Sequence, residues 1–554
     1  MTLAEPPSEL VEAPTATETR TRRGVGLPPA IPEAPVRRPW ERALEIVLLS
    51  IAVAATVVGV ALRFSGPRAL WLDEALTVNI SRLPLTRLFD ALRHDGSPPA
   101  YYVLLHYWMG VFGTGTRSVR ALAGVCSVLA LPLGWRLGSA VGGRRAAVAT
   151  VVVLACNPFA LRYGTENRMY SLVMLLALAA CLALVRTLQR PTLARLISFG
   201  LVCGLLLLTH YWALYLVGAL GICLFAASLR GPIRTQARLA LVALCAGGLL
   251  FLPWVPSFLF QVQHTGTPWA TPVDASLFVW TLGEFAAWGR RLGIALFVLY
   301  CMLLAVLVLA VVLRRVPAGQ RVADAVGWRR AVPAARFVLP AVVLFTVTLG
   351  TAFAGGLIAG AAFAYRYSSV VLPLVVLLVA LGITAVDRSR LGTVTAAAVL
   401  ATVAILGTVT GSQEILAQRT QAVQVAAEIS AYAHPGDVVA YCPDQLGPAV
   451  SRLLPERLLT QVTFPRFDDP QRINWVDYGR VNAAANPGVF ANEILNMAAG
   501  HQIWLVWEAG YLTLGSDCEE VLDALEVARP RSTEPVVSDP AHYYEHESLV
   551  RFSP

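Results

Sequence analysis

Charged residues are scarce in this chain of 554 residues, making up only 14% of it, against roughly 25% in a typical soluble domain. Lysine is absent, so all 44 basic residues are arginine. Hydrophobic residues account for 56%, and the mean hydropathy is +0.61. This composition excludes a plain cytosolic enzyme, a disordered scaffold and a small secreted module, and it indicates a polytopic membrane protein. The lack of Lys beside abundant Ala, Val and Leu is typical of a GC-rich genome, such as that of an actinobacterium.

The sequence also lacks a CxxC pair, a Cys/His metal spacing, a GxGxxG and a P-loop. Seven of the nine Cys lie in or beside apolar runs, where a free Cys is typically a small buried hydrophobe. The other two, Cys442 and Cys518, lie in the polar C-terminal part, where a disulfide is possible if that part is extracytoplasmic. The net charge of +9 lies largely beside the apolar runs. It therefore indicates membrane topology and lipid contact, and no nucleic-acid partner is expected.

Apolar runs near the roughly 20 residues that a membrane-spanning helix needs occupy most of the chain. We expect transmembrane helices near residues 44–64, 118–138, 146–163, 169–186, 196–211, 212–229, 239–257, 292–313, 337–360, 367–386 and 392–411. Arg residues gather in alternate connections between these runs, which predicts a cytoplasmic N-terminus and an extracytoplasmic C-terminus.

Composition divides the chain into three parts. Residues 1–42 are rich in Pro, Glu, Thr and Arg and are expected to form a disordered cytoplasmic tail. Residues 43–411 form the predicted transmembrane domain, whose first extracytoplasmic loop is 65–117. Within that loop, 100–110 is aromatic and too short to span, so we expect a helix along the membrane interface. Residues 412–554 are expected to form an extracytoplasmic α/β domain.

Four segments support that C-terminal α/β domain. Residues 421–432 and 519–527 have the pattern of amphipathic helices, whereas 437–441 and 503–507 have the pattern of buried strands. The predicted fold class is thus a polytopic α-helical membrane protein with a small C-terminal α/β domain.

Two adjacent acids, Asp73 and Glu74, follow the first apolar run. Carboxylates beside a membrane are costly unless they are solvated or used. They fit the solvated start of a helix after Pro67, because acids stabilise a helix N-terminus. They equally fit a base that accepts a proton from an attacking hydroxyl.

The next polar pair, His94 and Asp95, precedes a Gly-Ser-Pro-Pro turn and the aromatic pair Tyr101 and Tyr102. A turn followed by an interfacial aromatic anchor accounts for this pattern. The same pair could face the pocket of Asp73.

Later connections carry further candidates. The short turn from Arg162 to Tyr170 is dense in charge, and Arg168 with Tyr170 suits a lipid phosphate, because Arg presents a fixed fork of donors. An Arg–Glu surface pair is the alternative. His210 and Arg366 fall at other predicted outer ends, where Arg366 either pairs with a phosphate or extends to the headgroups.

All these clusters map to one face of the membrane. A channel would place polar residues within its spans, and a transporter would often show matched halves and broken helices. A membrane sensor that binds envelope glycan would not account for the acids of the first loop.

Several motifs together resemble a known family. In chain order they are Leu-Asp-Glu (72–74), His-Asp-Gly-Ser-Pro-Pro-x-Tyr-Tyr (94–102), Glu-Asn-Arg-Met-Tyr-Ser (166–171), Thr-His-Tyr-Trp (209–212) and Arg-Tyr (366–367). In this order they resemble the GT-C glycosyltransferases over about residues 40–410. The branch that they resemble is the family 39-like one, which includes protein O-mannosyltransferases and lipid A aminoarabinose transferases.

The resemblance implies inverting transfer of a sugar from a polyprenyl-phosphate donor to a hydroxyl outside the cytoplasmic membrane. It implies no metal and no cofactor, since the lipid-linked sugar is a substrate. The implied roles are catalysis for Asp73 and Glu74, with Asp73 as the base; acceptor contact for His94 and Asp95; and binding of the donor phosphate for Arg168, Tyr170, His210 and Arg366.

The expected location is the plasma membrane, and the expected partners are membrane lipids, the lipid-linked donor and a cell-envelope glycan or glycolipid acceptor. Mannose is the expected sugar and a lipoglycan or polysaccharide the expected acceptor. A polyprenyl-phosphate-arabinose donor, a protein acceptor, and a transporter or flippase for a lipid-linked sugar are the alternatives.

Overall fold

The computed structural model describes residues 39–66, 69–267, 270–313, 335–360, 362–385, 390–455 and 458–554. The predicted tail at residues 1–42 lies outside the described residues except for its end, which begins helix α1.

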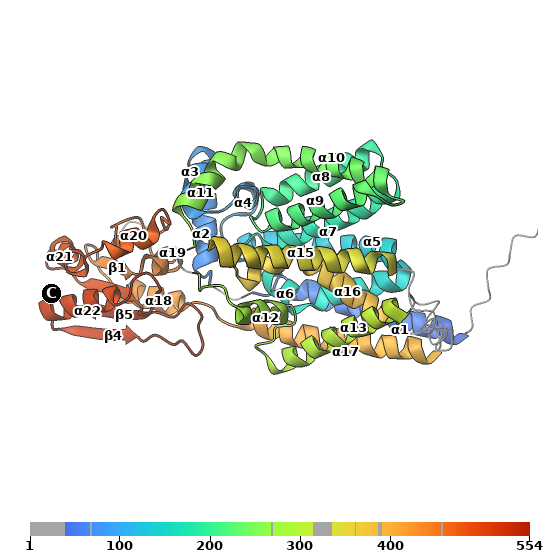
Figure 1. The fold of residues 1–554 in the computed structure, drawn as a ribbon. Helices are drawn as coiled ribbons and strands as arrows, with labels where there is room; N and C mark the ends of the chain where they lie inside the picture. Colours follow the sequence, from blue (N-terminus) through green and yellow to red (C-terminus); the bar gives the residue numbers. More distant parts are fainter. Residues whose placement is uncertain are drawn as a thin grey trace, which may run out of the picture.

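Long apolar helices lie side by side in a bundle that forms the larger part of the molecule (Figure 1). They are α1 (Pro39–Leu62), α5 (Thr116–Cys156), α7 (Tyr170–Gln189), α8 (Leu193–Leu207), α9 (Ala213–Leu229), α10 (Arg234–Gly248), α13 (Arg291–Leu313), α15 (Ala335–Ala359), α16 (Leu372–Thr384) and α17 (Arg390–Leu416). In the part of the chain that the structure describes, seven helices are long and apolar enough to cross a membrane, and α8, α9 and α16 are shorter apolar helices. Each predicted apolar run falls on one of these helices, while the exact number of crossings stays a prediction.

Helix α5 combines two of the predicted runs. Gly143 has φ 76° and ψ −167° inside it, a conformation that only glycine adopts readily. The chain turns back at this point, because Gly134 lies against Leu154 and Gly138 against Thr150. The two arms of α5 therefore pack against each other as two separate helices.

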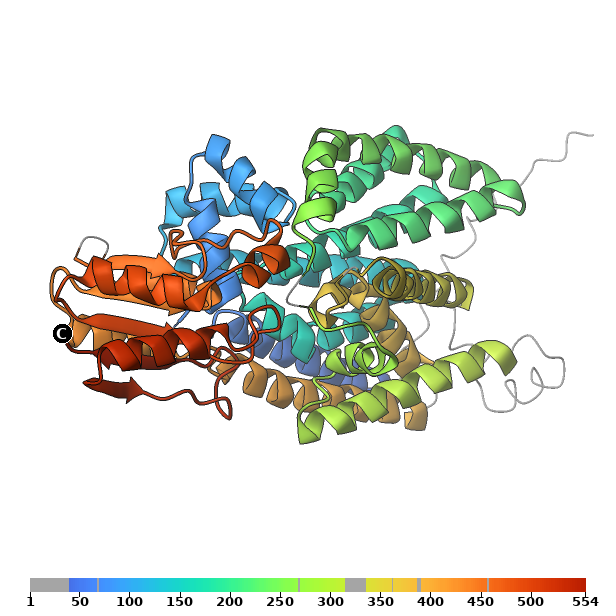
Figure 2. The same cartoon turned by 60° about the vertical axis from the view of Figure 1, so that its left-hand side comes forward.

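Three short helices, α2 (Leu72–Ser81), α3 (Leu85–Asp95) and α4 (Ala100–Phe112), lie between the bundle and the C-terminal domain (Figures 1 and 2). Helix α4 confirms the helix expected at 100–110. Its residues Tyr107 and Val111 are 59% and 75% exposed, which fits a helix with one face toward lipid.

The C-terminal domain contains a five-stranded sheet of order β2-β1-β3-β5-β4. The strands are β1 (Val438–Cys442), β2 (Thr460–Thr463), β3 (Ile503–Trp507), β4 (Ser532–Val536) and β5 (Ser548–Phe552), with β2 and β3 parallel to β1, and β5 antiparallel to β3 and β4. Helices α18 (Ala422–Tyr432), α21 (Pro487–Ala498) and α22 (Asp517–Ala528) pack around it. Both predicted strands and both predicted helices are confirmed, whereas β2, β4 and β5 were not predicted.

The disulfide that the sequence left open is present between Cys442 of β1 and Cys518 of α22. It ties the central part of the sheet to the helix that covers it.

The C-terminal domain is bonded to the first loop of the bundle. The backbone N–H of Leu72 donates to Oε2 of Glu545 at 3.0 Å, and Nδ2 of Asn79 donates to the carbonyl of Gln471 at 2.7 Å. Both contacts reach α2, so the C-terminal domain holds this helix near both of its ends.

Candidate active site

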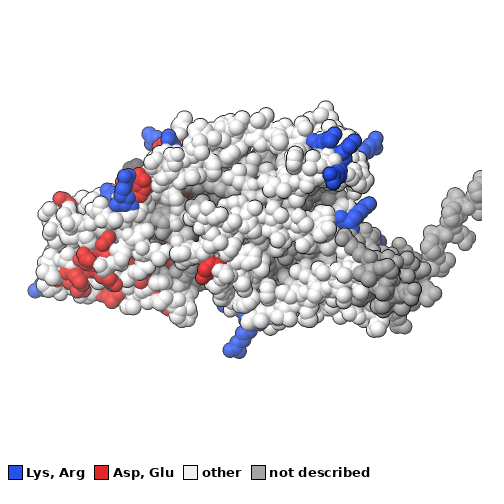
Figure 3. Space-filling view, viewed as in Figure 1, with Lys and Arg blue, Asp and Glu red and all other residues white. Residues whose placement is uncertain are grey.

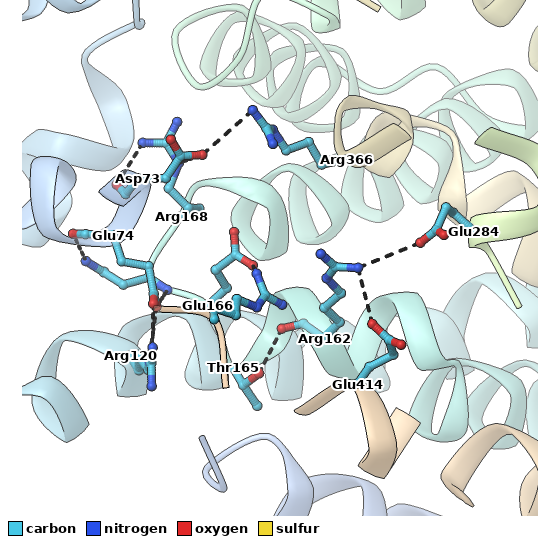
Figure 4. A network of polar contacts seen from close by, with 12 residues as sticks. Asp73, Glu74, Arg120, Arg162, Thr165, Glu166, Arg168, Glu284, Arg366 and Glu414 are labelled. Carbon is cyan, nitrogen blue, oxygen red and sulfur yellow. Dashed lines mark hydrogen bonds and ion pairs between the residues drawn. The ribbon is translucent and has the colours of Figure 1, made fainter. Parts of the chain in front are cut away.

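Asp73, in the first turn of α2, lies between two guanidinium groups. Its Oδ2 is 3.9 Å from Nε of Arg168 and 3.9 Å from Nη2 of Arg366 (Figure 4). The three side chains are only 19%, 11% and 15% exposed. Oδ2 is buried and has no hydrogen-bond partner among the described residues, so it is placed to accept a proton from a bound molecule.

Arg168 is held in place by groups of the first loop. Its Nη1 donates to Oγ1 of Thr77 at 2.6 Å, to the carbonyl of Asp73 at 3.2 Å and to the hydroxyl of Tyr102 at 3.3 Å. Because one edge of the guanidinium is used in this way, its position beside Asp73 is fixed.

Asp95 joins the same network through Tyr102, whose hydroxyl donates to Oδ2 of Asp95 at 3.1 Å. Burial raises the pKa of Asp95, whereas Arg168 and the bond from Tyr102 act in the opposite direction. The structure thus connects Asp95 to Asp73 through Tyr102 and Arg168.

Glu74 points away from Asp73 and is fully buried. Nε of Arg120 donates to its Oε1 at 2.7 Å, Nη2 of the same residue pairs with Oε2, and the N–H of Asn167 donates to Oε1 at 2.7 Å (Figure 4). Since both oxygens are engaged, the geometry favours a structural role for Glu74 in place of the predicted catalytic one.

His94 lies apart from this centre. Its Nδ1 bonds to the carbonyl of Asp90 at 2.9 Å, and its ring lies 6.5 Å from that of Phe260. Its carbonyl accepts the N–H of Trp475 at 3.2 Å. The sequence expectation that His94 shares a pocket with Asp73 therefore fails, because the imidazole bonds back to its own helix.

Tyr170, His210 and Tyr367 form an aromatic cluster in which each ring contacts the other two. The ring of His210 is 4.8 Å from Tyr367 and 5.9 Å from Tyr170. Burial, together with Arg168 and Arg366, lowers the pKa of His210 to about 3. Its Nδ1 accepts the N–H of Trp212 at 3.1 Å, so the neutral ring carries its proton on Nε2 and can donate from there.

A cavity of about 350 Å³ lies between Asp73 and the C-terminal domain. The first loop contributes Trp71 and Asp73 to its lining, and the bundle contributes Arg366. The C-terminal residues on its wall are Gln445, Trp475, Glu508–Thr513 and Tyr544–His546.

A second cavity, of about 260 Å³, shares Trp71, Arg366 and Tyr544 with the first. Three guanidinium groups line it, those of Arg366, Arg162 and Arg419. The two cavities thus meet at Arg366, whose Nη2 lies 3.9 Å from Oδ2 of Asp73.

The second cavity is framed by an ion network. Arg162 lies 3.2 Å from Glu414 and 3.8 Å from Glu284 (Figure 4). Arg290 lies 2.7 Å from Glu414, and Arg419 pairs with Glu166. Because the acids hold the guanidinium groups in fixed positions, the cavity is a preorganised site for an anion.

Sequence reasoning missed several residues that line these cavities, including Gln445, Glu508 and Glu545. Their segments lie far from Asp73 in the chain. The one local signal was the acid-rich Glu545–Glu547 stretch immediately before a strand.

No group of three or more His, Cys, Asp or Glu that could hold a metal ion occurs in the residues that the structure describes. The expectation that the reaction needs no metal and no cofactor stays untested.

A family model described as dolichyl-phosphate-mannose-protein mannosyltransferase matches residues 96–256. That range includes Arg168, Tyr170 and His210 but neither Asp73 nor Arg366. No curated protein sequence matches the chain.

Among solved structures, ArnT from Cupriavidus metallidurans in the apo state aligns with 92% of this chain and 98% of its own, at a TM-score of 0.58 and 12% identity. The oligosaccharyltransferase of Archaeoglobus fulgidus aligns over 83% of this chain and 68% of its own, at a TM-score of 0.48 and 12% identity. Arabinofuranosyltransferase AftD from Mycobacteria aligns over 93% of this chain and 41% of its own, at a TM-score of 0.48 and 13% identity. The likeness to ArnT shows that the chain has the GT-C fold with a C-terminal sheet-containing domain.

Proposed function

We propose that this protein is a membrane glycosyltransferase that moves a sugar from a polyprenyl-phosphate donor to an acceptor hydroxyl. The observation that carries the proposal is Asp73, whose Oδ2 lies 3.9 Å from both Arg168 and Arg366 at the junction of two cavities. A carboxylate base beside fixed cationic groups is what a displacement of phosphate by a hydroxyl requires.

In the proposed reaction the acceptor oxygen attacks the anomeric carbon of the donor sugar. The new C–O bond forms as the C–O bond to phosphate breaks, and the electron pair leaves with the polyprenyl phosphate. Asp73 takes the proton of the acceptor hydroxyl. Attack from the face opposite the leaving phosphate inverts the configuration at that carbon.

Arg366 and Arg168 stabilise the negative charge that develops on the departing phosphate. The cavity of about 260 Å³ extends this positive region through Arg162 and Arg419, so it suits the phosphate end of the donor. The neutral His210, whose ring lies 4.8 Å from that of Tyr367, supplies a further hydrogen-bond donor, since its pKa is lowered to about 3.

The neighbours support this class of donor. The model that matches residues 96–256 is described by dolichyl-phosphate mannose, and the ArnT fold covers nearly the whole chain. We propose mannose as the sugar and a cell-envelope lipoglycan or polysaccharide as the acceptor. Arabinose, as for the enzyme AftD, is the alternative.

The proposed location is the plasma membrane, with the site and the C-terminal domain outside. Figure 3 shows a cluster of blue groups without red ones at the bundle end far from the C-terminal domain, whereas red groups lie over that domain and further blue groups lie beside it. Arg residues concentrate on the cytoplasmic side of membrane proteins, which supports this orientation. The disulfide between Cys442 and Cys518 supports it as well, because an oxidising compartment maintains such bonds.

The test uses membranes that contain the full chain, radiolabelled polyprenyl-phosphate mannose or arabinose, and envelope glycan as acceptor. We expect transfer by the wild type and a loss of about 10²–10⁴-fold in Asp73→Asn, the range for removal of a general base. Asp469→Asn, which changes a half-exposed acid elsewhere, is the matched control. Transfer that is unchanged in Asp73→Asn removes Asp73 from its role, and movement of intact donor across vesicles without transfer favours a flippase.

A further inference from the structure

One wall of the larger cavity consists of residues of the C-terminal domain that have no role in the proposed reaction. Opposite Asp73, the C-terminal domain contributes Gln445, Trp475, Glu508 and Glu545 to its lining. A cavity of about 350 Å³ falls within the usual range for small-molecule sites.

Three buried oxygen atoms on the lining residues have no hydrogen-bond partner among the described residues: Oδ2 of Asp73, Oε1 of Gln445 and Oε1 of Glu545. Gln445 and Glu545 are only 4% and 5% exposed. Buried acceptors are nearly always paired in folded proteins, so these oxygens indicate a ligand that brings several donors. Hydroxyl groups supply such donors.

The wall is rigid before any ligand binds. Oε2 of Glu545 accepts the N–H of Leu72 at 3.0 Å. Oε2 of Glu508 accepts the hydroxyl of Ser538 at 2.5 Å and lies 2.9 Å from Nδ1 of His546. Because these contacts fix the carboxyl groups, a ligand would meet a preformed set of acceptors.

Trp475 adds an aromatic surface to the same wall. Its ring packs 4.9 Å from that of Tyr478, and the hydroxyl of Tyr478 donates to Asp444 at 2.5 Å. The indole is thus anchored from behind, and its cavity side suits the apolar face of a sugar ring.

The charges of the two cavities differ. In the smaller cavity the guanidinium groups of Arg162, Arg366 and Arg419 outnumber the carboxyl groups of Glu166 and Glu414. In the larger cavity the carboxyl groups of Asp73, Glu508 and Glu545 outnumber the single guanidinium, that of Arg366, which His546 accompanies on the wall. An anionic ligand in the larger cavity would meet carboxylates. Burial raises the pKa of Glu545, which favours its protonated form, and in that form the group can donate a hydrogen bond to a sugar oxygen.

We propose that the C-terminal domain binds the acceptor in the larger cavity as an uncharged, hydroxyl-rich saccharide, and that Gln445, Glu508 and Glu545 select it over an anionic one. This inference rests on the proposed function and deepens it, because it assigns the acceptor class and the domain that recognises it.

The first experiment compares two probes, methyl α-mannopyranoside and the corresponding uronic acid, as acceptors for labelled donor. We expect the neutral probe to be used and the acidic one to be used at least about tenfold less well, because its charge would lie against the carboxylates of Asp73 and Glu508. Gln445→Ala should raise the KM for the neutral probe about tenfold, as expected for one lost hydrogen bond to a buried group. The KM for the donor should not change in this variant.

The matched control is Gln424→Ala, which removes an exposed amide on α18. Glu508→Gln should raise the use of the acidic probe relative to the neutral one. Equal use of both probes by the wild type, or a change of the donor KM in Gln445→Ala, would overturn the proposal.

Direct binding separates failure of this inference from failure of the proposed function. Saturation-transfer NMR on the purified full chain with methyl α-mannopyranoside needs no turnover. Signal transfer that weakens in Gln445→Ala but not in Gln424→Ala supports the saccharide site even if no donor is consumed. Absence of signal in the wild type overturns the site even if transfer to another acceptor is active.

Discussion

Replacement of Glu74 by Gln tests whether this acid is structural or catalytic. The substitution keeps the size of the side chain and an oxygen that can still accept from the N–H of Asn167. It removes the negative charge that faces Arg120, whose side chain is only 9% exposed. An unpaired buried charge costs about 3–5 kcal/mol.

We take the lower end, about 3 kcal/mol, because the amide oxygen retains part of the hydrogen bonding. With roughly 2–4 °C per kcal/mol, the apparent melting temperature of Glu74→Gln in detergent should fall by about 6–12 °C. Asp73→Asn also removes a charge from a buried site, 3.9 Å from both Arg168 and Arg366, so it should lower the melting temperature as well. The decrease should be smaller than in Glu74→Gln, because Oδ2 makes no hydrogen bond that the substitution would remove.

The assay is thermal unfolding followed by loss of the monodisperse peak, with sugar transfer measured in parallel below the melting temperature. Glu534→Gln, on the exposed edge strand β4, is the matched control and should change neither property. The reasoning is refuted if Glu74→Gln melts like the wild type and yet loses transfer. Glu74 would then act chemically, as the sequence motif alone allowed.

The remaining predictions concern stability. The pKa of His210 is lowered from 6.5 to about 3, so below pH 6.5 the unfolded chain binds a proton that the folded chain does not, and stability falls. Between pH 7 and pH 5 the expected loss of stability is about 2 kcal/mol. His210→Asn should remove this pH dependence, as measured by unfolding curves at the two pH values. Replacing Cys442 and Cys518 by Ser removes a disulfide between residues 76 positions apart and should lower the free energy of unfolding by about 4 kcal/mol. Alkylation of the unreduced wild type should label neither residue. Gly247→Leu should separate α8 from α10 and lower the melting temperature, because a Cβ there would lie 2.0 Å from the carbonyl oxygen of Gly200.

Much of the fold could be predicted because its determinants are local. The length and apolarity of each run are enough to place a membrane-sized helix, and the runs at 118–138 and 146–163 were separated correctly at the Gly143 break. In the C-terminal domain the neighbouring strands β1 and β3, which are buried except for Trp507, were found, whereas the similarly buried β5 was missed. Strands β2 and β4 were missed because they are partly exposed and lack a continuous apolar pattern.

The site could be predicted only in part, because the direction of each side chain depends on tertiary packing. Asp73 and Glu74 are neighbours on one helix, and successive residues of a helix point about 100° apart. Sequence alone cannot tell which of the two faces a cavity. The structure distinguishes them, since Glu74 forms an ion pair with Arg120 and Asp73 faces the cavity. His94 is a similar case, because its imidazole bonds to the carbonyl of Asp90 instead of reaching the site.

The placement of Asp73 itself depends on a contact that no local pattern contains. Helix α2 has no side-chain cap from Trp71, its own N-cap residue. Oε2 of Glu545 accepts the N–H of Leu72 in its place, across 473 residues of sequence. A carboxyl group at this position satisfies one of the free N–H groups at the start of the helix. The orientation of the acid that we propose as the base is therefore set jointly by the membrane bundle, through Arg168, and by the C-terminal domain, through Glu545. A domain that both closes the cavity and caps this helix links acceptor binding to the position of the base, which is a physical reason for the two parts to occur in one chain.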